Sequence, residues 1–418
     1  MDVLVTGIGP ILPNCNTRHT LWQQLRDGAS QLRFEPVPDG DGNSDGGDRW
    51  AVGRIDDFDP GQWLGRFPRN YYQRYHRELQ LYLASLVVAL DDAGLDLARV
   101  SRERTGLFDG TSRGSFEYWY ERIRDERRCP PAELYSRRDL LLGTPGQSAS
   151  LAASLLGVRG PAFTFSITCC SGAVALGHAY RELVHGDLDV ALATGHDSAL
   201  AAPIYHAYRE AGLLSSERGD ARRAIRPFAD GSRNAFGEGA VTLVLETAEH
   251  AARRGATPLA RIAGFKYGNN GGHPLDIDRE GGRASALIGD VLRSAAVERD
   301  RIGFVVGHGN GVEQSDRSEL AYMRQVFGDR AGDVPLLSVK PIYGHLLGGS
   351  SALSVAAAAM MLDQRWLVPT ANAPAAGNAP IDHAGAGGRR CDAGAALTIS
   401  YGIGGHNAVT LLTRAEAA

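Results

Sequence analysis

The chain has 418 residues, a net charge of −4, and 43% hydrophobic and 22% charged residues. This composition excludes a disordered or collagen-like chain, and it gives no overall basic character of the kind that nucleic-acid binding requires. Of 44 lysines and arginines only two, Lys266 and Lys340, are lysine, which we attribute to a genome-wide codon preference.

The sequence predicts a soluble cytoplasmic protein. No apolar run reaches roughly 18 uncharged residues, so we expect no membrane span. The N-terminus carries an acidic residue at position 2 and lacks the basic region of a signal peptide. The cysteines are few and irregularly spaced, with neither a CxxC zinc pair nor a disulfide framework. They are Cys15, Cys129, Cys169, Cys170 and Cys391.

Elements of the first half alternate between strand and helix patterns. A glycine- and aspartate-rich segment at 36–48 predicts an exposed loop. The predicted strands are 2–8, 105–108, 162–167 and 189–194, and the predicted helices are 19–28, 71–93, 146–156 and the segment that follows Cys169.

The second half repeats this alternation. The predicted strands are 260–265, 302–307, 395–400 and 408–412, and the predicted helices are 284–298, 318–327 and 346–362. Because both halves carry βαβ-type units of similar size, we expect a duplicated α/β fold of two or five layers. We divide it into residues 1–256 and 257–418.

Cys169 lies where a predicted strand ends and an apolar helix begins. The free N–H groups and the dipole of a helix start favour a thiolate, lower the pKa of the thiol, and can hold a developing oxyanion. Free cysteines are also common as small core residues, and position alone does not say whether Cys169 or Cys170 reacts.

Two histidines lie in glycine-rich turns at the ends of predicted strands. His308 stands between Gly307 and Gly309, and His345 precedes an apolar helix. Two neutral histidines placed in this way could stabilise an enolate or oxyanion while a cysteine carries an acyl group. The long separations of these residues do not match the usual zinc spacings, so we expect no metal.

Lys340 lies five residues before His345. Arginine cannot replace the compact ammonium group where the geometry is tight, because its planar fork is larger and differently hydrated. A lysine retained in an arginine-rich chain therefore predicts a buried position beside the site, with chance as the alternative.

Six segments, in order along almost the whole chain, resemble the β-ketoacyl synthases (ketosynthases) of bacterial fatty-acid and type II polyketide systems. They are VLVTGIGPILP (3–13), GVRGPAFTFSITCCSGAVALGHAYRELVHGDLDVALATG (157–195), RPFADGSRNAFGEGA (226–240), GHGNGVEQSDRSE (307–319), VKPIYGHLLGG (339–349) and SYGIGGHNA (400–408). The resemblance implies the α/β thiolase fold, a duplicated αβαβα five-layer architecture that is usually dimeric across the nucleophile half.

The resemblance also implies roles for individual residues. Cys169 matches the nucleophile, His308 and His345 the two histidines that support decarboxylation and condensation, and Lys340 the lysine that hydrogen-bonds within the site. Further matches are Asp316 and Glu319 as supporting acids, Asn310 and Val312 at the positions that bind the pantetheine arm, and Ile403, Gly404 and Gly405 as the loop beside the nucleophile. The backbone N–H groups of Cys169 and Ile403 are the implied oxyanion donors.

The implied reaction is a decarboxylative Claisen condensation. Cys169 would accept an acyl chain from an acyl carrier protein, and a malonyl-type extender on a carrier would lose CO2 and attack it. No metal or other cofactor is implied, since the phosphopantetheine arm belongs to the carrier protein. The implied partners are that carrier and a second ketosynthase-like subunit, in a homodimer or a heterodimer.

Four departures from the family pattern leave alternatives open. The first histidine motif reads His308-Gly-Asn-Gly-Val without its usual hydroxyls, Ile403 replaces an aromatic gate, His406 replaces a threonine, and Tyr343 is unusually bulky. The leading hypothesis is an elongating ketosynthase of polyketide or other secondary-metabolite biosynthesis. The alternatives are a non-elongating acyltransferase or cyclase, and a non-catalytic, chain-length-factor-like subunit, which the presence of Cys169 disfavours.

Overall fold

The computed structural model describes residues 1–37, 49–126, 130–144, 146–374 and 381–415. Most of the loop predicted at 36–48, and Cys129, lie outside these residues. Across the described part of the chain, no helix combines the length and the apolar character needed to cross a membrane.

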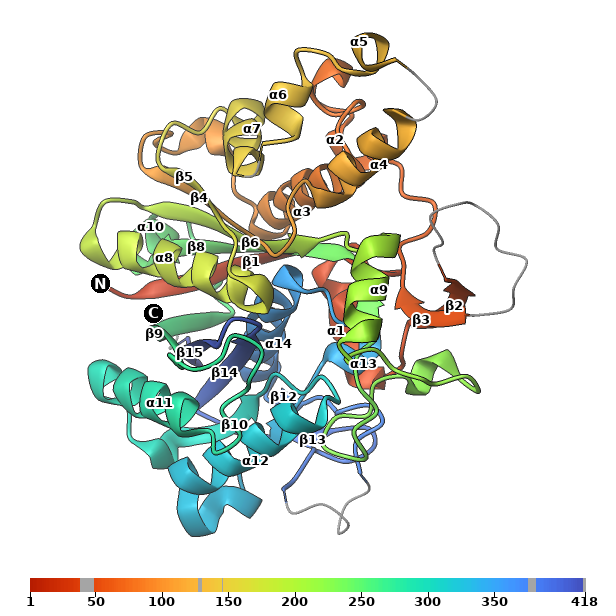
Figure 1. Cartoon of the computed structure of the whole chain (residues 1–418). Coiled ribbons are helices and arrows are strands. Elements are labelled where there is room, and N and C mark those ends of the chain that lie inside the picture. Colours follow the sequence, from red (N-terminus) through yellow and green to blue (C-terminus); the bar gives the residue numbers. More distant parts are fainter. Residues whose placement is uncertain (38–48, 127–129, 145, 375–380, 416–418) are drawn as a thin grey trace.

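One ten-stranded sheet runs through the molecule in the order β11-β10-β14-β15-β9-β1-β8-β6-β4-β5 (Figure 1). The strands of the first half are β1 (Val3–Ile11), β4 (Thr105–Thr111), β5 (Ala162–Phe165), β6 (Val190–Asp197) and β8 (Gly239–Thr247). Those of the second half are β9 (Ala260–Asn269), β10 (Ile302–Val306), β11 (Leu336–Leu337), β14 (Ala395–Gly402) and β15 (His406–Arg414). The two halves meet where residues 3–5 of β1 pair antiparallel with residues 260–262 of β9.

The two halves have the same topology. In the first, β4 is parallel to both β5 and β6, and the antiparallel pairs β6–β8 and β8–β1 complete the half. In the second, β10 is parallel to both β11 and β14, and the antiparallel pairs β14–β15 and β15–β9 follow. The predicted duplication is therefore present strand by strand, whereas the division at 256/257 into separate domains stays a prediction.

Helices form three layers around the sheet halves (Figure 1). The outer layer of the first half contains α3 (Arg77–Ala93), α4 (Phe116–Glu126) and α7 (Gln147–Leu156), the central layer α8 (Ser171–His185) and α14 (Gly348–Gln364), and the outer layer of the second half α11 (Gly282–Ala295) and α12 (Glu313–Phe327). This confirms the predicted five-layer α/β architecture. The helix predicted at 71–93 begins only at Arg77, because the chain runs from a 3-10 turn at Arg69–Tyr71 through further turns to His76, which is extended (φ −67°, ψ 161°).

Shorter elements complete the chain. The helices are α1 (Arg18–Asp27), α2 (Gly61–Leu64), α5 (Pro131–Leu134), α6 (Asp139–Leu142), α9 (Ala202–Glu210), α10 (Ala248–Arg253) and α13 (Lys340–Tyr343). The strands are β2 (Arg33–Pro36), β3 (Arg49–Gly53), β7 (Phe236–Gly237), β12 (Trp366–Leu367) and β13 (Arg389–Arg390).

Small residues bring the two central helices together. Helix α14 is buried along almost its whole length, as expected of an apolar helix without a polar face. A Cβ on Gly172 of α8 would lie 2.8 Å from Gly348 O and 3.1 Å from Ala352 N of α14, so this contact requires glycine. Because Cys169 precedes α8 and His345 precedes α14, the duplicated fold brings both residues to the same place.

Candidate active site

Cys169 lies in a tight 3-10 turn, Thr168–Cys170, between β5 and α8. Thr168 has φ = 47°, a left-handed conformation that few residues other than glycine adopt. Its Oγ1 donates a hydrogen bond to Ile403 O (3.1 Å), which ties the turn to the predicted loop between β14 and β15. The structure therefore holds the cysteine on a strained turn at the start of a buried helix.

The thiol of Cys169 faces His345, with 3.1 Å between Sγ and Nε2. The side chain is only 5% exposed. Burial raises the pKa of the Cys169 thiol to about 11, although Lys340 acts in the opposite direction. The lowered pKa that we predicted from the helix start is therefore wrong, because desolvation outweighs the effect of the helix. The thiol is protonated at neutral pH, and His345 is positioned to receive its proton.

His345 is held on both sides. Its backbone N–H donates to Ala235 O (2.8 Å), and its carbonyl accepts from Gly237 N–H (3.1 Å), so residues 235–237 fix its position. Its Nδ1 lies 2.7 Å from Ser350 Oγ, which also accepts from Leu346 N–H (2.8 Å). Sequence reasoning missed Ser350, for which the only signal is a hydroxyl five residues after the histidine.

His308 follows β10, and its loop is held by buried acids. Glu319 accepts hydrogen bonds from the backbone N–H groups of His308 (2.8 Å) and Gly309 (2.5 Å). Asp316 accepts from Phe228 N–H (2.6 Å). Burial raises the pKa of Glu319 to about 7 and, together with the charge of Glu319, that of Asp316 to about 8. Both predicted supporting acids thus bind backbone around the histidine.

Each nitrogen of the His308 ring has a polar neighbour. Tyr401 N–H lies 3.3 Å from Nδ1, and Asn310 Nδ2 lies 3.1 Å from Nε2. Asn310 Oδ1 in turn accepts from Val312 N–H (3.0 Å), which fixes the orientation of the amide. The ring stands perpendicular to that of His345, with centroids 5.5 Å apart. Asn310 and Val312 are thus engaged with the histidine loop itself.

Lys340 supplies the buried positive charge of the site. Its Nζ donates to the carbonyl oxygen of His308. Burial lowers the pKa of Lys340 to about 8, with Glu319 and Cys169 acting against this shift. Burial, followed by the charge of Lys340, lowers the pKa of His308 and of His345 well below its ordinary value. The site therefore contains two neutral imidazoles.

The glycine loop closes the site on the β14–β15 side. Gly404 and Gly405 have φ values of 98° and 76°, which glycine adopts without strain. A Cβ on Gly402 would lie 2.3 Å from Thr168 Oγ1, so the loop can approach the nucleophile turn only through glycine. Ile403 packs against the apolar cluster that contains Cys169.

The structure brings Cys169, His345, His308 and Lys340 into one chain of contacts. Cys170 points elsewhere, with its Sγ donating to Ser400 O (3.2 Å). No cluster of three or more histidine, cysteine or acidic side chains within the described ranges could hold a metal ion.

Comparison with known proteins gives the family. The model for the β-ketoacyl synthase N-terminal domain matches residues 1–251, and the model for the C-terminal domain matches residues 259–374. The chain belongs to the β-ketoacyl synthase family. It is an acyltransferase of the kind that catalyses Claisen condensation.

Relatives span nearly the whole chain. A Streptomyces halstedii protein named as polyketide β-ketoacyl synthase 1 is 31% identical, over 99% of this chain and 98% of its own. The ketoacyl synthase alpha subunit of the Streptomyces glaucescens tetracenomycin polyketide synthase is 29% identical (99% and 97%). The 3-oxoacyl-[acyl-carrier-protein] synthase 2 of Synechocystis is 28% identical (98% and 97%).

Solved structures confirm the thiolase fold. The ishigamide ketosynthase/chain length factor is similar with a TM-score of 0.88 and 26% identity, over 99% of each chain. A β-ketoacyl synthase from Burkholderia phymatum has a TM-score of 0.87 and 25% identity, over 99% of this chain and 100% of its own.

Proposed function

We propose that this β-ketoacyl synthase elongates an acyl chain carried on Cys169, in a polyketide-like secondary-metabolite pathway. The observation that carries the proposal is the 3.1 Å contact between Cys169 Sγ and His345 Nε2, with His308 and Lys340 next to it. The polyketide synthases among the relatives support the pathway assignment.

In the first stage, Cys169 accepts the acyl group from a carrier-protein thioester. Because the thiol is protonated at neutral pH, its proton passes to His345 Nε2 as sulfur attacks the carbonyl carbon. The backbone N–H groups of Cys169 and Ile403 are our oxyanion donors. The carrier's pantetheine thiolate leaves and takes up the proton, which restores neutral His345.

In the second stage, a malonyl-type thioester loses CO2. The Nε2 atom of His308 donates a hydrogen bond to its thioester carbonyl oxygen as the enolate forms, and His345 Nε2 does so once its ring has exchanged the proton on Nδ1 for one on Nε2. Tyr401 N–H faces His308 Nδ1 and favours the tautomer with the proton on Nε2. Ser350 Oγ accepts from His345 Nδ1–H in the first stage and donates to Nδ1 in the second. The enolate carbon then attacks the acyl carbonyl, the bond to sulfur breaks, and Cys169 leaves as thiolate.

Asn310 must yield for this second stage. Its amide nitrogen lies 3.1 Å from His308 Nε2, where the extender carbonyl has to bind. We propose that the carbonyl replaces the amide, which then contacts the pantetheine arm. Asn310 thus binds the pantetheine arm in place of the two hydroxyls that this histidine motif lacks.

The proposed partners are an acyl carrier protein, which brings its own phosphopantetheine, and a second ketosynthase-like subunit. Two names support this assembly: the tetracenomycin relative is called an alpha subunit, and the ishigamide structure is a ketosynthase with a chain length factor. The second subunit is another copy of this chain or a related one. In this proposal the reaction needs no metal and no resident cofactor. The protein is proposed to be cytoplasmic.

A matched pair of cysteine variants tests the nucleophile. The wild type, Cys169→Ala and Cys170→Ala are incubated with an acyl carrier protein thioester, and the intact mass of each protein is measured. We expect the acyl mass on the wild type and on Cys170→Ala only. Loading that survives Cys169→Ala would overturn the proposed nucleophile, because Cys170 is directed at Ser400 O.

A further inference from the structure

A cavity of about 200 Å³ lies between the start of α3, the turn after β4 and the start of α7. None of the four proposed catalytic residues lines it. Its lining includes Leu141 and Leu142 and a set of polar side chains, called here the polar wall. The polar wall consists of His76, Glu78, Thr111, Ser148 and His196.

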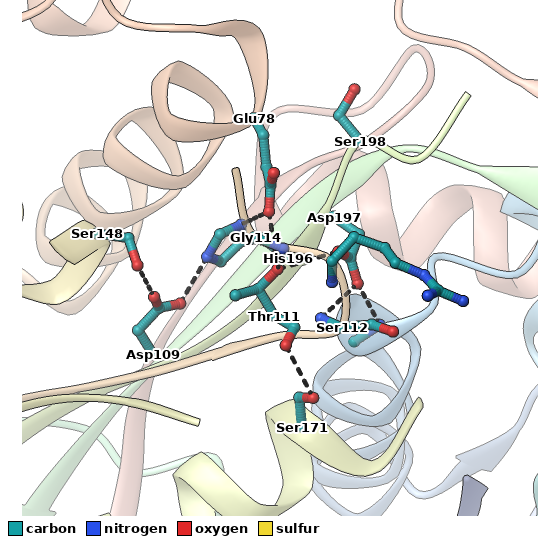
Figure 2. Close-up of polar contacts among 12 residues, drawn as sticks. Glu78, Asp109, Thr111, Ser112, Gly114, Ser148, Ser171, His196, Asp197 and Ser198 are labelled. Carbon is teal, nitrogen blue, oxygen red and sulfur yellow. Dashed lines mark hydrogen bonds and ion pairs between the residues drawn. The ribbon is translucent and has the colours of Figure 1, made fainter. Parts of the chain in front are cut away.

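A buried imidazole bridges two carboxylates at this wall (Figure 2). His196 Nδ1 lies 3.1 Å from Glu78 Oε1, and its Nε2 lies 2.6 Å from Asp109 Oδ1. All three side chains are at most 2% exposed. Burial alone would lower the pKa of His196, but the two carboxylates outweigh it and raise that pKa well above its ordinary value. The ring is therefore an imidazolium.

Two carboxyl groups face one imidazolium in this cluster. Burial raises the pKa of Glu78, although the hydrogen bond and the charge of His196 act in the opposite direction. The guanidinium of Arg113, which also lines the cavity, bonds Tyr208 Oη (3.1 Å). Apolar side chains of similar volume would serve stability at least as well as a buried ion cluster, so stability does not explain it.

His76 leaves a hydrogen-bonding position open on the same wall. It is the N-cap residue of α3 but makes no side-chain capping bond. Its Nδ1 is buried, with no partner among the residues that the structure describes. Burial, with the charge of His196, lowers the pKa of His76 to about 4, so the ring is neutral at pH 7 and offers a nitrogen to a ligand. Buried polar atoms are rarely left unpaired.

The cavity borders the nucleophile region. Its lining includes Ser166, three residues before Cys169, and residues of the turn that begins at Thr111. Thr111 O lies 3.1 Å from Ser171 Oγ, at the first residue of α8 (Figure 2). Arg113 lines the cavity, and its partner Tyr208 belongs to the apolar cluster around Cys169.

We propose that this cavity binds the distal end of the acyl chain on Cys169 and selects chains that end in a hydrogen-bond donor, a hydroxyl or a protonated amine. The inference rests on the proposed function, because the chain must first be loaded on Cys169. The Glu78 carboxylate and the open nitrogen of His76 both line the cavity and are acceptors for such a donor. A plain alkyl end would leave the His76 nitrogen unsatisfied.

The test compares three N-acetylcysteamine thioesters of equal length: 6-hydroxyhexanoyl, 6-aminohexanoyl and heptanoyl. Loading transfers the acyl group to Cys169 sulfur and releases N-acetylcysteamine, and intact mass gives the rate for each. We expect at least one donor-bearing chain to load about fivefold faster than heptanoyl, the ratio that one ordinary hydrogen bond supplies. The faster of the two identifies the donor as ammonium or hydroxyl.

Variants assign any such preference to the cavity. His76→Phe is expected to bring the ratio of donor to alkyl loading close to one, and Glu78→Gln to lower the ratio for the amine more than for the hydroxyl. The matched control is His19→Phe, on the exposed face of α1, which is expected to keep the wild-type ratio. Because each ratio is measured within one variant, a general loss of folded protein does not change it.

The loading assay separates failure of this inference from failure of the proposed function. Equal loading of all three thioesters, or a preference unchanged in His76→Phe, would overturn this inference and leave the proposed nucleophile standing. No loading by any thioester or carrier would overturn the proposed function, and this inference with it.

Discussion

Lys340→Arg is the most pointed substitution in the site, because it keeps the charge and changes only its shape. Lys340 is 2% exposed and its Nζ donates to His308 O, so a larger guanidinium has no solvent into which to move. Hydrogen bonds from charged groups contribute about 1.5–3 kcal/mol. At about 1.4 kcal/mol per tenfold in rate, losing this one predicts a fall of roughly 10- to 150-fold in CO2 release from malonyl carrier protein.

The matched control is Lys266→Arg, at the only other lysine of the chain. Lys266 lies in β9, where it pairs with Val409 of β15, and we expect its replacement to leave CO2 release unchanged. Circular dichroism and the melting temperature of both variants check that they are folded. A folded Lys340→Arg variant with the wild-type rate would refute the argument that the site needs a compact ammonium.

Three further predictions follow from the geometry. Because the pKa of Cys169 is about 11, the rate at which iodoacetamide alkylates it should rise about tenfold per pH unit between roughly pH 7 and 10. A rate that reaches a plateau near pH 7 would mean that the pKa of this thiol is lowered instead. Ser350→Ala removes the hydrogen-bond partner of His345 Nδ1. Losing this hydrogen bond, of about 1–2 kcal/mol, should slow acyl loading of Cys169 roughly 5- to 30-fold, as measured by intact mass. An unchanged loading rate would mean that the His345 ring does not depend on Ser350. Gly172→Ala places a Cβ 2.8 Å from Gly348 O. This overpacking should destabilise the fold by about 1–3 kcal/mol and lower the melting temperature by several degrees. An unchanged melting temperature in calorimetry would contradict the close contact of the two central helices.

Much of the fold could be predicted because its determinants are local. Periodicity predicted the helix before β4, and a glycine turn marked the end of β10. The pairing of β1 with β9, which joins the two halves into one sheet, has no local signal, since it depends on residues about 257 positions apart.

The active site, like the fold, could be predicted from the sequence only in part. The motif glycines and the residue types predicted Cys169, His308, His345 and Lys340 as a set, and the structure brings them together. The direction of the thiol pKa was predicted wrongly, because a sequence shows the helix start but not the depth of burial. The His196 cluster could not be predicted either, since its three charges come from three separate elements, α3, β4 and β6.

The most direct test of the central claim is a condensation assay that follows one isotope. Protein loaded with an acyl group on Cys169 is mixed with malonyl carrier protein labelled in the free carboxyl carbon, and both released CO2 and the carrier-bound product are measured. The account predicts labelled CO2 and an unlabelled β-ketoacyl carrier in equal amounts, with neither formed by Cys169→Ala. An acyl group that leaves Cys169 without CO2 release would contradict elongation and identify the protein as a non-elongating acyltransferase.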